Sequence, residues 1–154
     1  MGGAIKRSLY ICAMLLSASL VGAEVALQDD RGNSVSLAKP AQRIISLAPN
    51  ITESLYAIGA GQTIVGADEF SNYPEQAQAI PRVSNYASAN YEQILSLRPD
   101  LVISWYSGNG EEIVRRVRQL GLNLFVAEPR SLQDIPRLLL KLGRLTGQQQ
   151  QAQQ

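Results

Sequence analysis

The sequence contains no histidine, and its single cysteine, Cys12, lies close to the N-terminus. Histidine is the side chain that most often serves as a general base near neutral pH and that most often binds a metal ion. The carboxylates Asp68-Glu69 and Glu111-Glu112 are adjacent within each pair, so their side chains diverge instead of converging on one reacting atom. We therefore predict that the chain is not an enzyme and that it has no catalytic residue, metal site or cofactor.

The N-terminal segment has the pattern of a secretory signal peptide. Two basic residues, Lys6 and Arg7, precede the apolar run Leu9–Leu20, and small residues lead to the expected cleavage point after Ala23. The run is shorter than the about 20 residues that a membrane-spanning helix needs. We therefore expect residues 1–23 to be a cleaved signal peptide and the protein to act outside the cytoplasm, without membrane insertion after cleavage. An uncleaved N-terminal anchor is the alternative.

From residue 24 onward the chain has nearly balanced charge. This part contains 12 of the 14 basic residues, since Lys6 and Arg7 precede it, and all 13 acidic ones. Such a balance gives no electrostatic reason to expect nucleic acid or an anionic membrane surface as a partner. Its length, 131 of the 154 residues, is typical of one domain.

Short apolar segments after residue 24 predict strands. Val25–Leu37 is expected to form a β-hairpin, because the polar residues 29–33 separate two small apolar segments. Later apolar runs of three to five residues are typical of strands buried on both faces of a parallel sheet. These runs are Ile44–Leu47, Thr63–Val65, Leu101–Ile103 and Leu122–Val126. The stretch 71–89 has no clear periodicity, and we expect a long loop with a functional role there.

Helix start and stop signals lie between these runs. Asn50, Asn90 and Asn109 are each followed three residues later by Glu or Gln, a spacing that predicts a capping box. Helix ends are expected at Gly59, Pro99 and Gly121. A hairpin followed by alternating strands and helices predicts an α/β protein with an open, mainly parallel sheet and helices on both faces.

Aromatic residues mark the expected ligand site. In an open α/β sheet, ligands bind beyond the carboxyl ends of the strands. Six of the nine aromatic residues lie between residues 70 and 106, near several of these ends, and aromatic faces suit a large, ring-rich ligand. Trp105, at a strand end, is predicted to face the ligand, whereas Tyr91, on a helix, is predicted to pack against the sheet. Physical reasoning alone explains Glu92 as a carboxylate that stabilises the start of a helix.

Six segments carry motifs whose order and spacing are familiar: Arg43–Glu53, Val65-Gly66, Ser71–Ala77, Val83-Ser84, Glu92–Ile103 and Leu120-Gly121. In these segments the sequence resembles the periplasmic binding proteins for vitamin B12, haem and iron-siderophores, and within them the cobalamin-binding branch. The resemblance implies a Rossmann-like lobe in the periplasm that forms part of the substrate-binding component of an ABC importer.

The resemblance also implies site residues and partners. Phe70, Tyr86 and Trp105 match positions that line the ligand in the cobalamin binder, and Glu92 matches a glutamate that pairs with arginines of the permease. The implied partners are therefore an ABC transporter permease and a corrinoid, which is cargo and not a cofactor. A ferric siderophore or haem is the alternative ligand within the same family.

Members of this family have two lobes joined by a long helix. By resemblance, residues 24–147 are expected to form the N-terminal lobe. The Gln-rich residues 148–154 are expected at the start of the interlobe helix, with the C-terminal lobe absent. The other interpretation is a truncated interaction module that docks on a permease or a separate partner without holding ligand alone.

Overall fold

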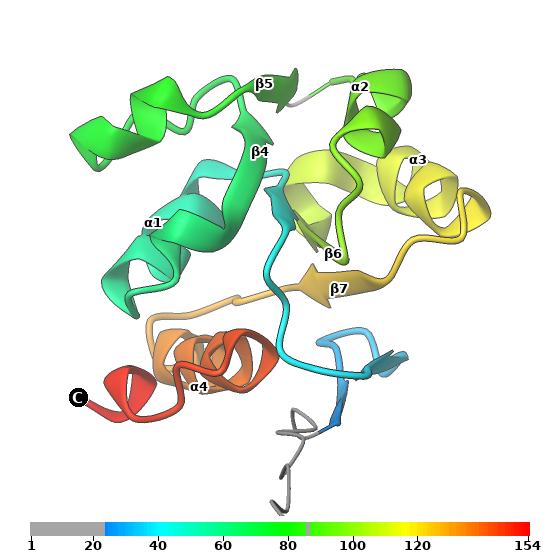
Figure 1. The fold of residues 1–154 in the computed structure, drawn as a ribbon. Helices are drawn as coiled ribbons and strands as arrows, with labels where there is room; N and C mark the ends of the chain where they lie inside the picture. The colour runs from blue at the N-terminus through cyan, green and yellow to red at the C-terminus, as the bar shows by residue number, and fades with distance from the viewer. Residues whose placement is uncertain (1–23, 86) are drawn as a thin grey trace, which may run out of the picture.

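The computed structural model describes residues 24–85 and 87–154, and its centre is a five-stranded parallel sheet (Figure 1). The strand order is β5-β4-β3-β6-β7, and every neighbouring pair is parallel. The strands are β3 (Ile44–Ser46), β4 (Ile64–Asp68), β5 (Arg82–Ser84), β6 (Leu101–Trp105) and β7 (Leu124–Ala127). An antiparallel hairpin, β1 (Val25–Gln28) and β2 (Ser34–Leu37), precedes the sheet. Both the parallel sheet and the leading hairpin confirm the sequence prediction.

The helices cover both faces of this sheet (Figure 1). They are α1 (Pro49–Ala57), α2 (Tyr91–Ser96), α3 (Tyr106–Gln119) and α4 (Asp134–Thr146). Successive strand residues point to opposite faces, so Ile44 packs in the core with α1 and α4, while Ile45 packs in the core with α2 and α3. This alternation explains why the strands are mostly apolar: most of their residues are buried under one layer of helices or the other.

Strand β5 lies inside the stretch 71–89, which was expected to be a loop. The strand has only three residues and pairs with the end of β4. A short helical segment, η2 (Glu75–Ala79), precedes it. Three residues are too few to show a periodic pattern, so this edge of the sheet was not detectable from periodicity.

Two of the three predicted capping boxes are wrong. Only Asn90 caps its helix, where its side chain accepts a hydrogen bond from the backbone N–H of Gln93 at 3.0 Å. Helix α1 begins two residues earlier than an N-cap at Asn50 requires, with Pro49 in its first turn, so Asn50 lies inside it. Helix α3 begins at Tyr106, and Asn109 serves a different purpose, described below.

The Gln-rich end of the chain folds back on α4. This helix ends at Gly147, whose φ of 76° is a left-handed conformation that favours glycine. The following residues include the short segment η3 (Gln151–Gln153), and Ala152 lies against Gly143 of α4. Residues 148–154 therefore do not continue α4.

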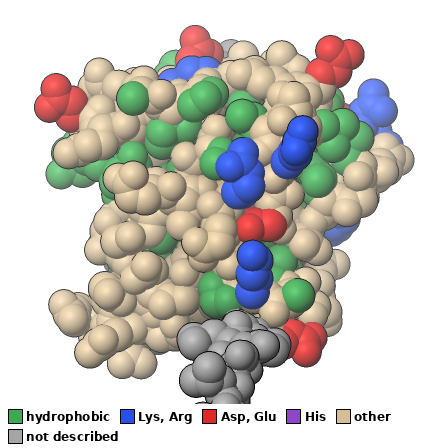
Figure 2. Space-filling view, viewed as in Figure 1, with side chains coloured by type: hydrophobic (Ala, Val, Ile, Leu, Met, Phe, Trp, Pro, Cys, Tyr) green, Lys and Arg blue, Asp and Glu red, His purple; other side chains and the backbone are tan. Residues whose placement is uncertain are grey.

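The expected signal peptide, residues 1–23, and Tyr86 lie outside the described residues. Within the described part of the chain, no helix is both long and apolar enough to cross a bilayer. On the face seen in Figure 2, basic and acidic side chains lie beside one another near the middle, so no extended surface of one charge is visible there.

Candidate functional site

The strand order creates a crevice between β3 and β6. These neighbouring strands lead to helices on opposite faces of the sheet, since β3 continues into α1 and β6 into α3. The chain therefore leaves the two strand ends in opposite directions, and the space between them is where open α/β sheets bind ligands. The topology thus places the candidate site at the carboxyl ends of β3, β4 and β6.

A pocket with a volume of about 230 Å³ lies at this position. It is lined by Leu47, Ala48, Pro49, Asp68, Phe70, Trp105, Gly108 and Asn109, most of which are apolar. The structure therefore brings together Phe70 and Trp105, two of the three residues expected to contact ligand. Phe70 is half-exposed, and Trp105 is partly buried. We call this site the apolar pocket.

Gly108 allows the Trp105 ring to lie where it does. A Cβ atom at residue 108 would overlap the indole ring, with its second-nearest ring atom at 2.9 Å. The indole Nε1 is buried and has no hydrogen-bond partner among the described residues. Gly108 thus has a packing role that the sequence alone did not reveal.

Asn109 joins the ends of β3 and β6. Its Oδ1 accepts a hydrogen bond from the backbone N–H of Trp105 at 2.9 Å, and its Nδ2 donates to the Leu47 carbonyl at 2.7 Å. The side chain can point inward because Gly110, with φ of 75°, interrupts the helical backbone immediately afterwards. Asn109 therefore fixes two parts of the pocket wall, whereas its sequence context suggested a helix cap.

Buried hydroxyl groups hold the segment that carries Phe70. Thr52 on α1 donates a hydrogen bond to Ser46 Oγ at 2.8 Å and contacts Ser71 Oγ at 2.9 Å. From the other side, the Arg82 guanidinium donates to the carbonyls of Asp68 and Ser71. These contacts fix the segment 68–71 between α1 and β5, so Phe70 extends from a supported backbone.

Asp68 is a buried carboxyl group in the wall of the apolar pocket, with 2% exposure. Its Oδ1 accepts a hydrogen bond from the Phe70 backbone N–H at 2.8 Å. Burial raises the pKa of the Asp68 carboxyl above its ordinary value, and the hydrogen bond from Phe70 opposes this effect only in part.

Replacing Asp68 with asparagine is expected to remove a pH-dependent loss of stability. Because the folded-state pKa is raised, the parent's free energy of unfolding falls as pH rises from 3.8 through the folded-state value. The Asn carbonyl can still accept the bond from Phe70. In urea denaturation, the stability of Asp68→Asn relative to the parent should increase as the pH is raised from about 3.5 to about 7. A constant difference between the two pH values would contradict the assignment.

Glu92 does not line the apolar pocket. It lies exposed on α2, and its carboxylate has no hydrogen-bond or ion-pair partner in residues 24–85 and 87–154. Tyr91, its neighbour, is half-buried and packs against the core beneath α2 and α3, as expected from the sequence. Within the same residues, no group of three or more His, Cys, Asp or Glu side chains could hold a metal ion.

Comparison with known proteins agrees with this architecture. Residues 44–154 match the family described as periplasmic binding protein. A vitamin B12-binding protein from Vibrio vulnificus (strain CMCP6) is 44% identical over 103 residues, which are 66% of this chain and 38% of that protein. One from Yersinia pestis (strain Pestoides F) is 36% identical over 117 residues, or 76% of this chain and 42% of that protein.

Two solved structures show the same fold. The periplasmic vitamin B12 binding protein BtuF of Vibrio cholerae aligns with a TM-score of 0.71 and 39% identity, over 74% of this chain and 45% of that one. The haem binding protein HmuT aligns with a TM-score of 0.71 and 25% identity, over 85% of this chain and 43% of that one. This chain therefore spans less than half the length of each relative.

These matches agree with the prediction of a protein that binds a ligand and is not an enzyme. The matching residues begin at the first residue of β3 and run to the end of the chain, so they include the whole five-stranded sheet. They also include both aromatic residues of the apolar pocket. The chain belongs to the periplasmic binding protein family.

Proposed function

We propose that this chain is one lobe of the substrate-binding component of an ABC importer for vitamin B12 or a related corrinoid. The observation that carries the proposal is the apolar pocket, where Phe70 and Trp105 meet at the carboxyl ends of the central strands. We further propose that residues 1–23 direct export to the periplasm and are then cleaved. The relatives that are vitamin B12-binding proteins support the choice of ligand.

The shape of the pocket suits a ligand that lies across it. Pockets that enclose a small ligand usually have volumes of about 300–1,000 Å³, and the volume here is about 230 Å³. Exposed aromatic faces stack against flat rings, and a corrinoid presents such a ring together with apolar edges. The pocket would therefore cover one side of the ligand, and a facing surface would be needed to cover the other.

Haem is the second candidate ligand, because the haem binding protein HmuT aligns over a larger share of this chain than BtuF does. Equilibrium titration with cyanocobalamin, haem and a ferric siderophore distinguishes the candidates. The proposal expects saturable binding that is tightest for cyanocobalamin. Tighter binding of haem would reassign the ligand, and no binding of any of the three would support the interaction module without ligand.

We also propose that Glu92 docks on the permease. A carboxylate that is exposed and has no partner within the described residues is free to pair with an arginine of another protein. Such an ion pair contributes little binding free energy until the two surfaces meet and exclude water. This property suits transient docking.

Charge reversal by Glu92→Arg is expected to weaken docking by at least about tenfold, because it replaces an attraction by a repulsion at the interface. Binding to a purified cobalamin importer in nanodiscs measures this loss, and ligand titration should remain unchanged. Glu53→Arg is the matched control, since Glu53 is an exposed carboxylate on α1. Equal docking by the parent and the Glu92 variant would show that the assignment is wrong.

A further inference from the structure

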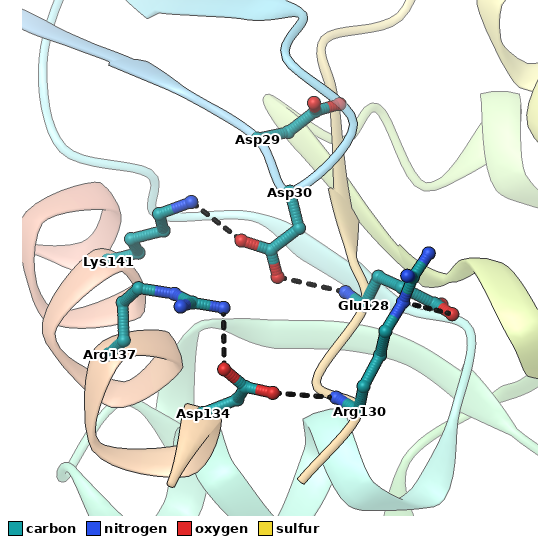
Figure 3. A pocket seen from close by; sticks show the side chains of 7 residues that line it. All are labelled: Asp29, Asp30, Glu128, Arg130, Asp134, Arg137 and Lys141. Atoms are coloured by element: carbon teal, nitrogen blue, oxygen red, sulfur yellow. Dashed lines mark hydrogen bonds and ion pairs between the residues drawn. The ribbon is translucent and has the colours of Figure 1, made fainter.

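A second, polar pocket lies beside the end of β7 and has a volume of about 430 Å³ (Figure 3). Its side chains come from the turn between β1 and β2, the segment after β7, and α4. They are Asp29, Asp30, Glu128, Arg130, Asp134, Arg137 and Lys141. We call this site the polar pocket.

Two of its carboxylates are engaged on both oxygens. Asp30 accepts hydrogen bonds from Lys141 Nζ at 2.6 Å and from the backbone N–H of Glu128 at 2.9 Å. Asp134 pairs with Arg137 through Oδ1 at 2.9 Å, while its Oδ2 accepts from the backbone N–H of Arg130 at 3.0 Å. In Figure 3 Lys141 and Arg137 point toward their carboxylates. Both cations are therefore committed within the chain.

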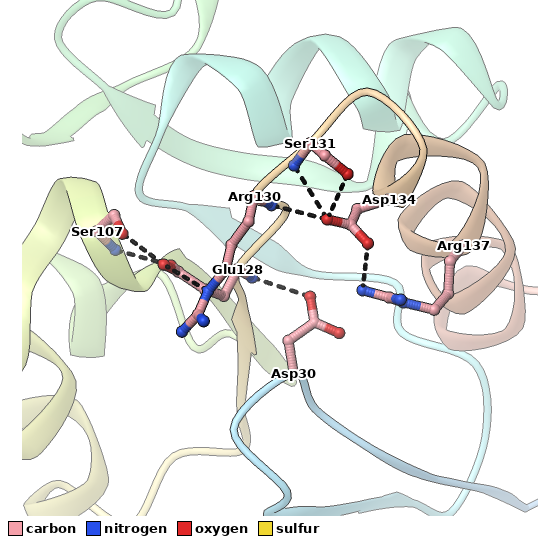
Figure 4. A network of polar contacts seen from close by, with 7 residues as sticks. All are labelled: Asp30, Ser107, Glu128, Arg130, Ser131, Asp134 and Arg137. Atoms are coloured by element: carbon pink, nitrogen blue, oxygen red, sulfur yellow. Dashed lines mark hydrogen bonds and ion pairs between the residues drawn. The ribbon is translucent and has the colours of Figure 1, made fainter.

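Glu128 is held by the first turn of α3. Its Oε2 accepts a hydrogen bond from the backbone N–H of Ser107 at 2.9 Å, and its Oε1 accepts from the Ser107 hydroxyl (Figure 4). Both oxygens therefore already have strong donors.

Arg130 is the cation that remains available. Its guanidinium makes only one long ion pair, 3.8 Å from Glu128 Oε1, and donates no hydrogen bond to any described residue. Its side chain is 75% exposed. Figure 4 shows it extending alongside Glu128, with the guanidinium next to the Glu128 carboxylate. A guanidinium of this kind presents donors in the planar arrangement that binds phosphate or carboxylate.

The position of Arg130 connects the two pockets. Ser107, which holds Glu128, is followed directly by Gly108 and Asn109, and these two residues line the apolar pocket. Trp105 and Ala127 are partners in the sheet, so Arg130, three residues after Ala127, lies on the strand-end side of the sheet where the apolar pocket is found. A ligand that covers Trp105 and extends over the start of α3 reaches Arg130.

We infer that Arg130 binds an oxyanion on the edge of the ligand whose ring lies on the apolar pocket. This inference rests on the proposed function and makes Arg130 a specificity-determining residue of the same site. The oxyanion is the phosphodiester of cobalamin or a propionate carboxylate of haem, since both attach a negative group to a flat macrocycle.

Ligand pairs that differ in the oxyanion test this inference. Arg130→Gln removes the charge and keeps a polar side chain of similar length. We expect it to weaken cyanocobalamin binding by about tenfold, as for a charge-assisted hydrogen bond. Dicyanocobinamide, which lacks the phosphodiester, should bind the parent and the variant within about twofold of each other. Haem and its dimethyl ester form the corresponding pair for the carboxylate.

Arg115→Gln is the matched control, because Arg115 is an exposed arginine on α3 that pairs with Glu112 and lines neither pocket. The Arg115→Gln variant should bind each of the four ligands with the same affinity as the parent. Equal losses for ligands with and without the oxyanion would overturn the inference. The inference would also be overturned if Arg130→Gln left every ligand affinity unchanged while Trp105→Ala weakened the binding of all the ligands. In that case the proposed function would stand. A parent chain that binds none of the four ligands would overturn both.

Discussion

Replacing Trp105 with alanine is expected to weaken ligand binding by about 30-fold and to leave the fold intact. A ring-shaped ligand that covers one face of the indole removes on the order of 80 Å² of apolar surface from water, equivalent to about 2 kcal/mol. The fold should survive because Trp105 is only partly buried and its indole Nε1 has no partner among the described residues. Equilibrium titration with cyanocobalamin measures the affinity, and circular dichroism checks the fold.

Gly108→Ala tests the same claim without removing the ring. The added Cβ atom would overlap the indole, so Trp105 must move, and ligand affinity should fall although every aromatic group remains. Tyr91→Ala is the control, since Tyr91 packs against the core beneath α2 and α3 and lies outside the apolar pocket. Full affinity in both Trp105→Ala and Gly108→Ala would remove Trp105 from the site.

The second large effect concerns Asn109. Asn109→Ala is expected to lower the free energy of unfolding by about 2–4 kcal/mol, because the Leu47 carbonyl and the Trp105 amide each lose a buried hydrogen-bond partner. Urea denaturation measures this loss. The affinity for ligand should fall as well, since the two strand ends that form the pocket wall are no longer joined.

Asn50→Ala is the matched control for Asn109→Ala. Both asparagines were predicted to be helix caps, but the Asn50 Oδ1 is buried and has no hydrogen-bond partner in the described part of the chain. Its removal should therefore change stability by less than about 0.5 kcal/mol or increase it slightly. Similar losses for the two variants would show that the Asn109 bonds do not stabilise the fold.

The contrast between Asn50 and Asn109 shows which structural features a sequence pattern can predict and which it cannot. The parallel sheet was predictable because runs such as Ile44–Leu47 are mostly apolar, and all four of these residues are buried, as two covered faces require. A capping box is a short-range pattern, and only the position of the first helical turn decides whether an asparagine caps it. Pro49 starts α1 early, and Gly110 turns Asn109 inward, so tertiary contacts determined both outcomes.

The two pockets also differ in whether the sequence could predict them. Phe70 and Trp105 could be assigned to one site because each lies at or just after the end of a strand, and parallel strands end at the same edge of the sheet. The polar pocket could not be assigned from the sequence, because its main contacts join residues about a hundred positions apart. Asp30, for example, contacts Glu128 and Lys141. A charged residue in a turn or helix has no sequence signal that identifies a partner so distant.

The central claim is that a ligand lies on the apolar pocket at the junction of β3 and β6. Trp105 is the chain's only tryptophan, so an ¹H–¹⁵N spectrum contains a single indole N–H resonance that reports on this pocket. Titration with diamagnetic cyanocobalamin should shift that resonance, together with the Gly108 and Asn109 amides, along one saturable curve. Saturable shifts elsewhere on the surface, with the indole resonance unmoved, would contradict the account.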